Sequence, residues 1–179
     1  AYELGYRAHL GTQLNVDVAL FANDYENLLA TQANLVDDNR GEERSQGVEI
    51  AFNWVPLSGT RIRGSWSTIH LHRSNRTPHQ NWQLHGSYDL TPQIELDLGF
   101  YYDGRRVFPD PTGAGNDIRK GGELRTDVRI SWKPLSPLTI ALVGQNLFDR
   151  ERVENFFVAG LQEATHIQRS VFVEASVAF

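Results

Sequence analysis

Three histidines come nearer than any other residues of this sequence to the spacing of a metal site. His70 and His72 lie two positions apart and so share one face of a strand, and His79 follows shortly beyond. Imidazole nitrogens are common ligands of transition metals. However, no carboxylate is fixed beside them at ligand spacing, and the sequence has no cysteine. We therefore interpret the three histidines as polar loop residues and predict neither a metal site nor a cofactor.

Two carboxylates, Glu95 and Asp97, also share a strand face, a spacing that could be mistaken for the acid pair of a glycosidase. Arg125 and Arg129 fall on the strand expected to lie beside them, so ion pairs across the strands explain both acids more simply. The sequence contains no nucleophile elbow, P-loop or HExxH motif. We predict that the protein is not an enzyme.

A third group of residues could recognise an anion. Arg105 and Arg106 come directly after a strand that contains Tyr101. A guanidinium group binds a carboxylate or catecholate through two parallel hydrogen bonds, so these three residues are candidate contacts for an anionic chelate. Ordinary solvation of a loop is the alternative. Phe156 and Phe157, in a later polar stretch, either contact the same ligand or pack within their own loop.

The elements that carry these residues are strands of strict alternation. Between Leu124 and Trp132, apolar or Thr side chains occupy one parity while charged or hydroxylated side chains occupy the other. Two prolines, Pro134 and Pro137, then interrupt the pattern, which resumes at Leu138. Similar alternation predicts nine strands, near residues 2–10, 14–22, 48–54, 62–68, 82–90, 94–102, 124–132, 138–142 and 171–179.

Composition excludes several classes of protein. The 179 residues have a mean hydropathy of −0.41, and no window approaches the roughly 18 consecutive apolar residues of a membrane helix. In a transmembrane barrel, alternating lipid-facing and lumen-facing residues average to a polar sequence, so this composition does not exclude such a barrel. The net charge is −5 and the basic residues are scattered, which argues against a nucleic-acid partner. The chain contains no Met and starts in the middle of a strand pattern, so we expect it to be a piece of a longer protein.

The lengths of the connections alternate between short and long. Brief turns are predicted near residues 11, 56, 91 and 134, and longer loops over 26–46, 72–79, 104–122 and 149–167. Outer-membrane barrels have short periplasmic turns and longer extracellular loops. A soluble sandwich or a lipocalin-like barrel is the alternative, since its strands also alternate. Neither gives a reason for long connections at one end only, or for Trp and Tyr near strand ends, whereas a membrane barrel does.

Several short motifs follow one another along the chain in an order that resembles the C-terminal part of the barrel of TonB-dependent outer-membrane receptors. They are Glu3-Leu-Gly-Tyr6, Phe21-Ala-Asn-Asp-Tyr25, Gly47-Val-Glu-Ile50, Pro78-His-Gln80, Tyr88-Asp-Leu90 and Gly144-Gln-Asn-Leu-Phe-Asp149. The terminal Phe179 fits as well, and the resemblance covers essentially residues 1–179.

The resemblance implies an all-β fold, an antiparallel up-and-down transmembrane barrel of about 22 strands, of which this chain supplies the last nine. It implies a place in the bacterial outer membrane, in contact with lipid, and uptake of a scarce nutrient, first of all a ferric siderophore or other iron chelate. The implied partners are an N-terminal plug domain and the remaining strands, the TonB complex acting through that plug, and the barrel-assembly machinery, which would read Phe179. A general diffusion porin or a small structural barrel is the alternative, and haem, cobalamin and glycans stay open as ligands.

Overall fold

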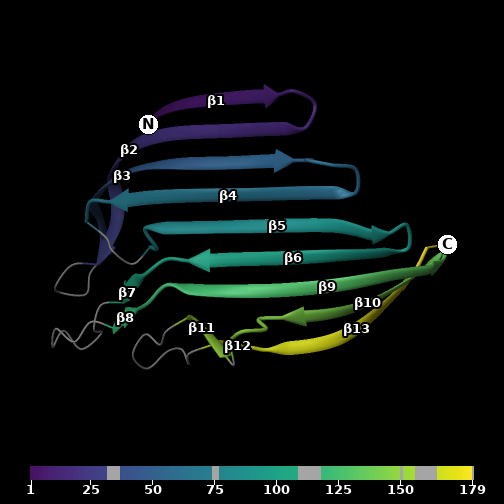
Figure 1. Ribbon diagram of the computed structural model, residues 1–179. Coiled ribbons are helices and arrows are strands. Elements are labelled where there is room, and N and C mark those ends of the chain that lie inside the picture. The colour runs from purple at the N-terminus through teal and green to yellow at the C-terminus, as the bar shows by residue number, and fades with distance from the viewer. Residues whose placement is uncertain (32–36, 74–76, 109–117, 150, 156–164, 179) are drawn as a thin grey trace.

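The computed structural model describes residues 1–31, 37–73, 77–108, 118–149, 151–155 and 165–178, and most of these residues form β-strands. Nine strands make one antiparallel sheet in which each strand pairs with the strand before it (Figure 1). This confirms the predicted all-β class and the number of strands in the sheet. The nine are β1 (Tyr2–Leu10), β2 (Leu14–Thr31), β3 (Asp37–Trp54), β4 (Thr60–Leu71), β5 (Gln80–Thr91), β6 (Ile94–Asp103), β9 (Glu123–Leu135), β10 (Leu138–Gln145) and β13 (Ser170–Val177).

The connections at the two ends of the sheet differ in length. The short turns gather at the right of Figure 1 and the long connections at the left. Gly11 and Gly59 adopt positive φ angles of 65° and 75° in two of the short turns, a conformation that glycine reaches without steric cost. Two long connections contain hairpins of their own, β7 (Arg106–Phe108) with β8 (Ile118–Lys120), and β11 (Glu151–Asn155) with β12 (Thr165–Gln168). The predicted loops 104–122 and 149–167 are therefore partly strand.

The predicted loop 26–46 is wrong over most of its length. β2 continues to Thr31 and β3 begins at Asp37, so the two strands form a long hairpin that continues past the ends of β1 and β4. The ladder has irregularities between Tyr25 and Ala30, and Asn27 has a positive φ of 59°. Among the described residues, no third strand pairs with this arm, which consists of residues 23–31 of β2 and 37–44 of β3. A two-stranded ribbon without a covered face needs no apolar parity.

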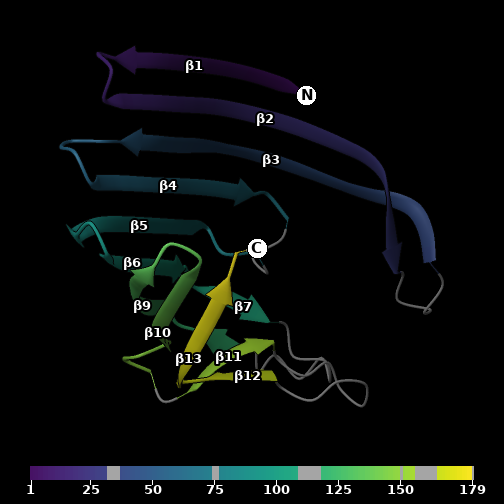
Figure 2. The same cartoon turned by 90° about the vertical axis from the view of Figure 1, so that its right-hand side faces the viewer.

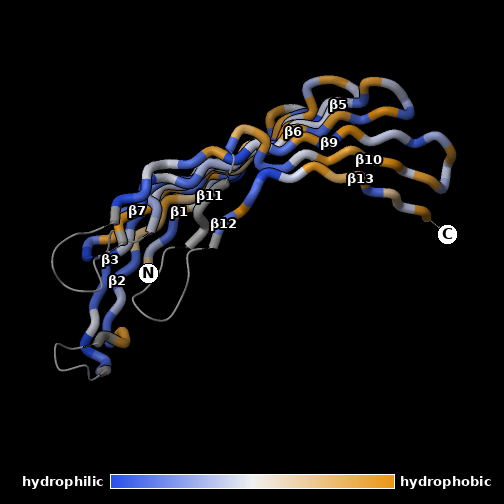
Figure 3. Tube along the Cα trace, turned by 90° about the horizontal axis from the view of Figure 1, so that it is seen from below, coloured by the Kyte–Doolittle hydropathy of each residue, from blue (hydrophilic) through white to orange (hydrophobic). Residues whose placement is uncertain are grey.

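The two faces of the sheet carry different side chains, and the hydropathy of the strands alternates along the trace (Figure 3). A row of directly opposed apolar residues crosses four adjacent strands, and it consists of Leu96, Ile130, Leu142 and Val173. Ile130, Leu142 and Val173 are 43%, 51% and 68% exposed. Among the described residues only two hydrophobic side chains are buried, Ala141 and Val143. The sheet has no covered core of the kind that a soluble sandwich needs, and its apolar face is open.

Aromatic side chains lie at both ends of the apolar face. Trp54 and Trp132 are near the short turns, while Trp82 and Tyr102 stack at 5.6 Å between ring centroids near the long connections. Trp132 is opposite Ile94, eight positions before Tyr102 on β6. At about 3.4 Å per residue this is about 27 Å along the strand, close to the apolar band of about 25 Å between the aromatic girdles of outer-membrane barrels.

No helix in the ranges that the structure describes is long and apolar enough to span a membrane.

Candidate functional site

The polar face of the sheet is hollowed. A space of about 530 Å³ is lined by residues from six adjacent strands, β3, β4, β5, β6, β9 and β10. Its polar lining side chains include Arg61, Arg63, His85, Asp97 and Arg129. Six neighbouring strands can surround a common space only on the concave side of a curved sheet, and the sheet curls in Figure 2. The polar face is therefore the inner face of the curve, and the apolar face is the outer one.

Ion pairs cover much of this inner face. Arg129 Nη1 lies 3.4 Å from Asp97 Oδ2, which confirms one of the pairs expected between these strands. Glu95 instead meets Arg61 of β4, at 2.9 Å between Nη2 and Oε2. Arg125 turns to Asp127 on its own strand, and two parallel hydrogen bonds of 2.9 and 2.5 Å join them. Glu95 and Asp97, the suspected glycosidase pair, are therefore each bound by an arginine and form structural ion pairs.

Tyr101 lies on the inner face at the centre of a cluster. Its ring is 5.0 Å from the ring of His85 in an edge arrangement, and the guanidinium carbon of Arg125 lies 5.2 Å from the ring centroid. The ring leans over Gly99, where a Cβ would come within 3.2 Å of the tyrosine hydroxyl. Tyr101 therefore lines the hollow on the concave face of the sheet.

Arg105 and Arg106, predicted to act together, have different surroundings. Arg106 Nη2 pairs with Asp103 Oδ2 at 3.3 Å, and its Nε is buried. Arg105 is exposed, and it has no ion-pair partner in the part of the chain that the structure describes. The two residues follow the end of β6 at which the long connections lie. Their role as ligand contacts stays a prediction.

Three other predicted residues, Phe156, Phe157 and Phe179, lie outside the described residues. The sequence reasoning did not single out Arg63 or His85 as site residues. Both belong to the polar parity of their strands, and the register places them directly opposite each other. The alternation of the sequence therefore indicated that both side chains face inward. It did not indicate that they are opposite each other, because alternation does not fix the register between strands.

The three histidines do come together near the end of β4. The rings of His70 and His79 stack at 5.9 Å between centroids, and His70 and His72 are 6.4 Å apart edge to face. His79 Nδ1 is 3.2 Å from the backbone oxygen of Ile69. Within the described ranges no group of three or more His, Cys, Asp or Glu is arranged to hold a metal ion.

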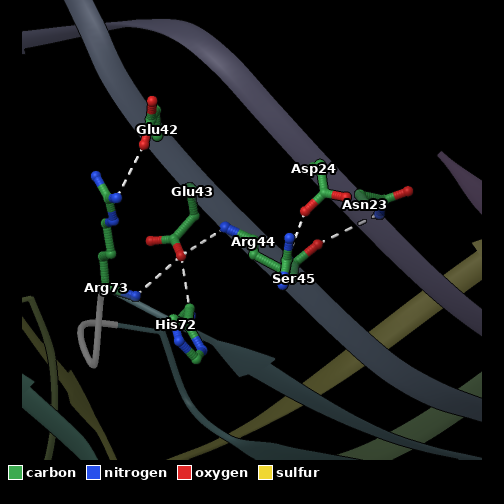
Figure 4. A network of polar contacts seen from close by, with 8 residues as sticks. All are labelled: Asn23, Asp24, Glu42, Glu43, Arg44, Ser45, His72 and Arg73. Atoms are coloured by element: carbon green, nitrogen blue, oxygen red, sulfur yellow. Dashed lines mark hydrogen bonds and ion pairs between the residues drawn. The ribbon is translucent and has the colours of Figure 1, made fainter.

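A polar network ties this histidine-bearing segment to the β2–β3 arm (Figure 4). Glu43 Oε1 accepts the backbone N–H groups of Arg44, His72 and Arg73 at 2.9, 2.9 and 3.0 Å. The N–H of Arg73 contributes most to holding the pKa of the Glu43 carboxyl below its ordinary value, because each donor stabilises the charged form. Arg73 also pairs with Glu42 at 2.9 Å.

A second pair in the same network joins the two strands of the arm. Arg44 Nε lies 2.5 Å from Asp24 Oδ1, and this hydrogen bond raises the pKa of Arg44. Glu43 of β3 therefore binds the first two residues after β4, and Arg44 of β3 binds Asp24 of β2.

The sequence matches the family described as TonB dependent receptor-like, beta-barrel, over residues 1–147. The chain belongs to this family. Membership implies the outer membrane of a Gram-negative bacterium, and the family is one of receptors and transporters and not a class of enzymes. In a barrel of this family the outer, apolar face of the sheet is expected to meet lipid, and the inner, polar face to line the lumen. No curated protein sequence matches the chain closely enough to count as a relative.

Solved receptor structures have the same fold. The ferric-catecholate import receptor Fiu from Escherichia coli K12 superposes with a TM-score of 0.82 at 20% identity, over 99% of this chain and 27% of that one. The ferric yersiniabactin uptake receptor FyuA from Yersinia pestis gives 0.82 at 19% identity, over 99% and 29%. The siderophore receptor PiuA from Acinetobacter baumannii gives 0.78 at 20%, over 97% and 27%. The chain therefore spans less than a third of the length of these receptors, and at such identities the likeness shows the fold alone.

Proposed function

We propose that residues 1–179 form the C-terminal part of the barrel of an outer-membrane receptor that takes up an iron chelate, first of all a ferric siderophore. A plug domain fills the lumen of the complete barrel, and the TonB complex supplies energy by acting on that plug. The observation that carries the proposal is a wall of this barrel family whose concave face is lined by charged and hydroxylated side chains. The names of the similar structures, which are siderophore receptors, support the same class of ligand.

In the proposed receptor, each part of this chain has a role. The outer face holds the barrel in lipid, and the long connections lie on the extracellular side, where a chelate arrives. Tyr101, Arg105 and Arg106 come near that end, and Phe156 and Phe157 belong to its last connection. Guanidinium groups and aromatic rings suit a chelate with carboxylate or catecholate groups, since the former bind anions in pairs and the latter offer flat apolar surface.

The test is uptake by cells that carry the full-length gene. Cells deleted for the gene and then complemented should accumulate radioactive iron from at least one ferric siderophore, and the accumulation should disappear in a strain that lacks TonB. Failure with every chelate offered, in cells whose outer membrane contains the folded receptor, would contradict the proposal.

A general diffusion porin is the second candidate, and the family match disfavours it. The two differ in conductance, because a lumen filled by a plug blocks ion flow whereas a porin leaves an aqueous channel. Single-channel recording of the full-length protein in a planar bilayer separates them. A large steady conductance together with no energy-dependent uptake would favour the porin.

A further inference from the structure

The guanidinium groups around the inner-face hollow are not all matched by carboxylates of the wall. Glu95 is used by Arg61, and Asp97 by Arg129. Both oxygens of Asp127 receive Arg125, and its Oδ1 also accepts the backbone N–H of Asn146 at 3.0 Å. The acids that line the hollow are thereby engaged.

Arg63 is the arginine of this hollow to which no carboxylate of the described wall is bound. It is exposed, and within the described ranges no hydrogen bond, ion pair or ring contact joins it to another residue. It stands in a row of directly opposed residues that crosses five adjacent strands. The row consists of Asn53, Arg63, His85, Gly99 and Asp127.

The neighbours of Arg63 leave room beside it. Gly99 has no side chain, and the ring of Tyr101 leans across it, so that its hydroxyl lies over the same row. The edge contact between Tyr101 and His85 holds the imidazole next to Arg63. Arg63 is also close enough to Tyr101 to interact with it electrostatically. The three side chains together offer guanidinium, imidazole and phenol N–H or O–H donors toward one space, a donor set that suits a carboxylate.

We propose that Arg63, with His85 and Tyr101 beside it, receives the side-chain carboxylate of an Asp or Glu in a protein segment that lies inside the complete barrel. The inference rests on the proposed function, in which a plug domain fills the lumen. It assigns to this stretch of wall one charged contact with that domain, deep in the barrel, since Arg63 is four residues past Gly59 of a short turn.

A protein side chain fits the surroundings better than a free anion does. The side chains beside Arg63 include the amides of Asn53 and Gln145 and the hydroxyl of Ser87, which match the hydrogen-bonding groups of a protein surface. A tethered domain also presents its carboxylate at an effective concentration of about millimolar, without any free ligand present.

Zero-length cross-linking of the full-length receptor tests the contact. In an Arg63→Lys variant the lysine amine lies where the guanidinium was, and a water-soluble carbodiimide joins an amine to a carboxylate only when the two touch. Mass spectrometry of the digested receptor should show residue 63 linked to an Asp or Glu outside residues 1–179. Arg129→Lys is the matched control, because its partner Asp97 is known and the expected link lies within this chain. Links from position 63 only to Glu95, Asp97 or Asp127, or no link while the control links, would overturn the proposal.

A second measurement uses the unmodified receptor and needs no variant to fold. A dicarbonyl reagent modifies free guanidinium groups, and Arg105 is the exposed reference. In receptor purified in chloride buffer, Arg63 should react at least about tenfold more slowly than Arg105, which corresponds to a contact of about 1.4 kcal/mol. Protection that appears only after citrate is added would identify a free anion as the occupant and overturn the proposal. Iron uptake is measured in the same strain. If the cells take up iron but residue 63 forms no cross-link, only the proposed contact is rejected. If the receptor conducts ions as an open channel and the cells take up no iron, the proposed function is rejected.

Discussion

The Glu43 carboxylate accepts the backbone N–H of His72 at 2.9 Å, a contact that joins the β2–β3 arm to the first residue after β4 (Figure 4). The same oxygen accepts the N–H of Arg73. One side chain of the arm therefore fixes the direction in which the chain leaves β4. We expect Glu43→Ala to increase hydrogen exchange at the amide of Arg73 several-fold in the full-length receptor, because this donor loses the carboxylate that accepts it. Exchange at His72 should rise less, because its N–H also donates to the backbone oxygen of Arg44 at 3.0 Å.

Glu42→Ala is the control for that change, since it removes only the side-chain pair with Arg73 and leaves the Glu43 acceptor of the Arg73 N–H in place. Unchanged exchange at Arg73 in Glu43→Ala, or an equal rise in both variants, would show that the carboxylate does not hold this segment.

The same contact should depend on pH. The pKa of Glu43 is lowered in the folded protein, so its stabilising effect is fully present above the unfolded value of about 4.3. The effect is lost as pH falls through the lower folded value, because protonation weakens the acceptor. Protection of the Arg73 amide should be constant from neutral pH down to about 5 and fall only in more acid solution. Exchange measured over a pH series, corrected for intrinsic rates, checks this. A loss of protection centred near neutral pH would point instead to the nearby histidines.

The register of the sheet predicts opposite effects for two neighbouring residues of β5. Leu84 is on the outer, apolar face, 36% exposed in this sheet, and Gln83 is on the inner face, directly opposite Ser65 and Tyr101. We expect Leu84→Arg to lower the free energy of unfolding in lipid vesicles by about 1–2 kcal/mol, since a guanidinium then faces hydrocarbon between the membrane interface and the midplane. Gln83→Arg, which places the same group in the lumen, should change it by less than about 1 kcal/mol. Denaturant titration of the full-length receptor measures both, and a larger loss for Gln83→Arg would mean that the faces are exchanged.

Spin labels give an independent check of the same faces. A lipid-soluble quencher should reach labels at the predicted lipid-facing positions, which are Leu96, Leu98, Ile130, Leu142 and Val173. A label at Asp97 should be reached by a water-soluble quencher instead.

Ligand contact at the extracellular end should depend more on Arg105 than on Arg106. Arg105 presents a guanidinium that no described carboxylate holds, whereas Arg106 is already paired with Asp103. Arg105→Ala should weaken binding of the transported chelate by about ten- to a hundred-fold, the loss of one charge-assisted pair. Arg106→Ala should have a smaller effect. Equilibrium binding of the ferric chelate to purified receptor measures both, and unchanged affinity in the double variant would remove the two residues from the site.

Much of the fold was predictable because each strand of the large sheet has one apolar outer face and one polar inner face. That division imposes an alternation of period two, and the number of strands in the sheet follows from counting such stretches. The β2–β3 arm gave no such signal, since in the described part of the chain no other strand pairs with it beyond the ends of β1 and β4. Its strands are held by backbone ladders and by pairs such as Arg44 with Asp24, which need no apolar side chain.

The arrangement of the inner face was predictable only in part, for a different reason. Parity assigned Asp97 and Arg129 to one face, and their pairing followed. It did not reveal that Glu95 would turn to Arg61, or that Arg63 would lie opposite His85, because those contacts depend on the register that turn geometry sets between strands far apart in sequence.

The last prediction concerns the end of the final strand. β13 pairs along one edge with β10, from Ser170 opposite Gln145 to Val177 opposite Leu138, and the N–H of Ala178 donates to the Pro137 oxygen at 2.8 Å. Its other edge has no strand partner among the described residues. In lipid an unpaired edge leaves backbone donors and acceptors unsatisfied at a cost of several kcal/mol each, so that edge must meet another strand of the barrel.

We expect Phe179, two positions beyond the end of β13, to be the residue by which the assembly machinery recognises this strand before closure. Two positions before it stands Val177, an aliphatic residue, so in this proposal recognition depends on the ring of Phe179. Deleting Phe179 should lower the amount of folded full-length receptor in the outer membrane several-fold, while the chelate affinity of the molecules that do assemble stays within about twofold, since the strand end is far from the extracellular connections. Phe179→Tyr is the control and should assemble normally, because it keeps an aromatic ring suited to the membrane interface. Quantitative blotting of heat-modifiable receptor together with chelate binding separates assembly from affinity. Normal abundance after the deletion would remove Phe179 from assembly, and weakened binding at normal abundance would place it in the ligand pathway instead.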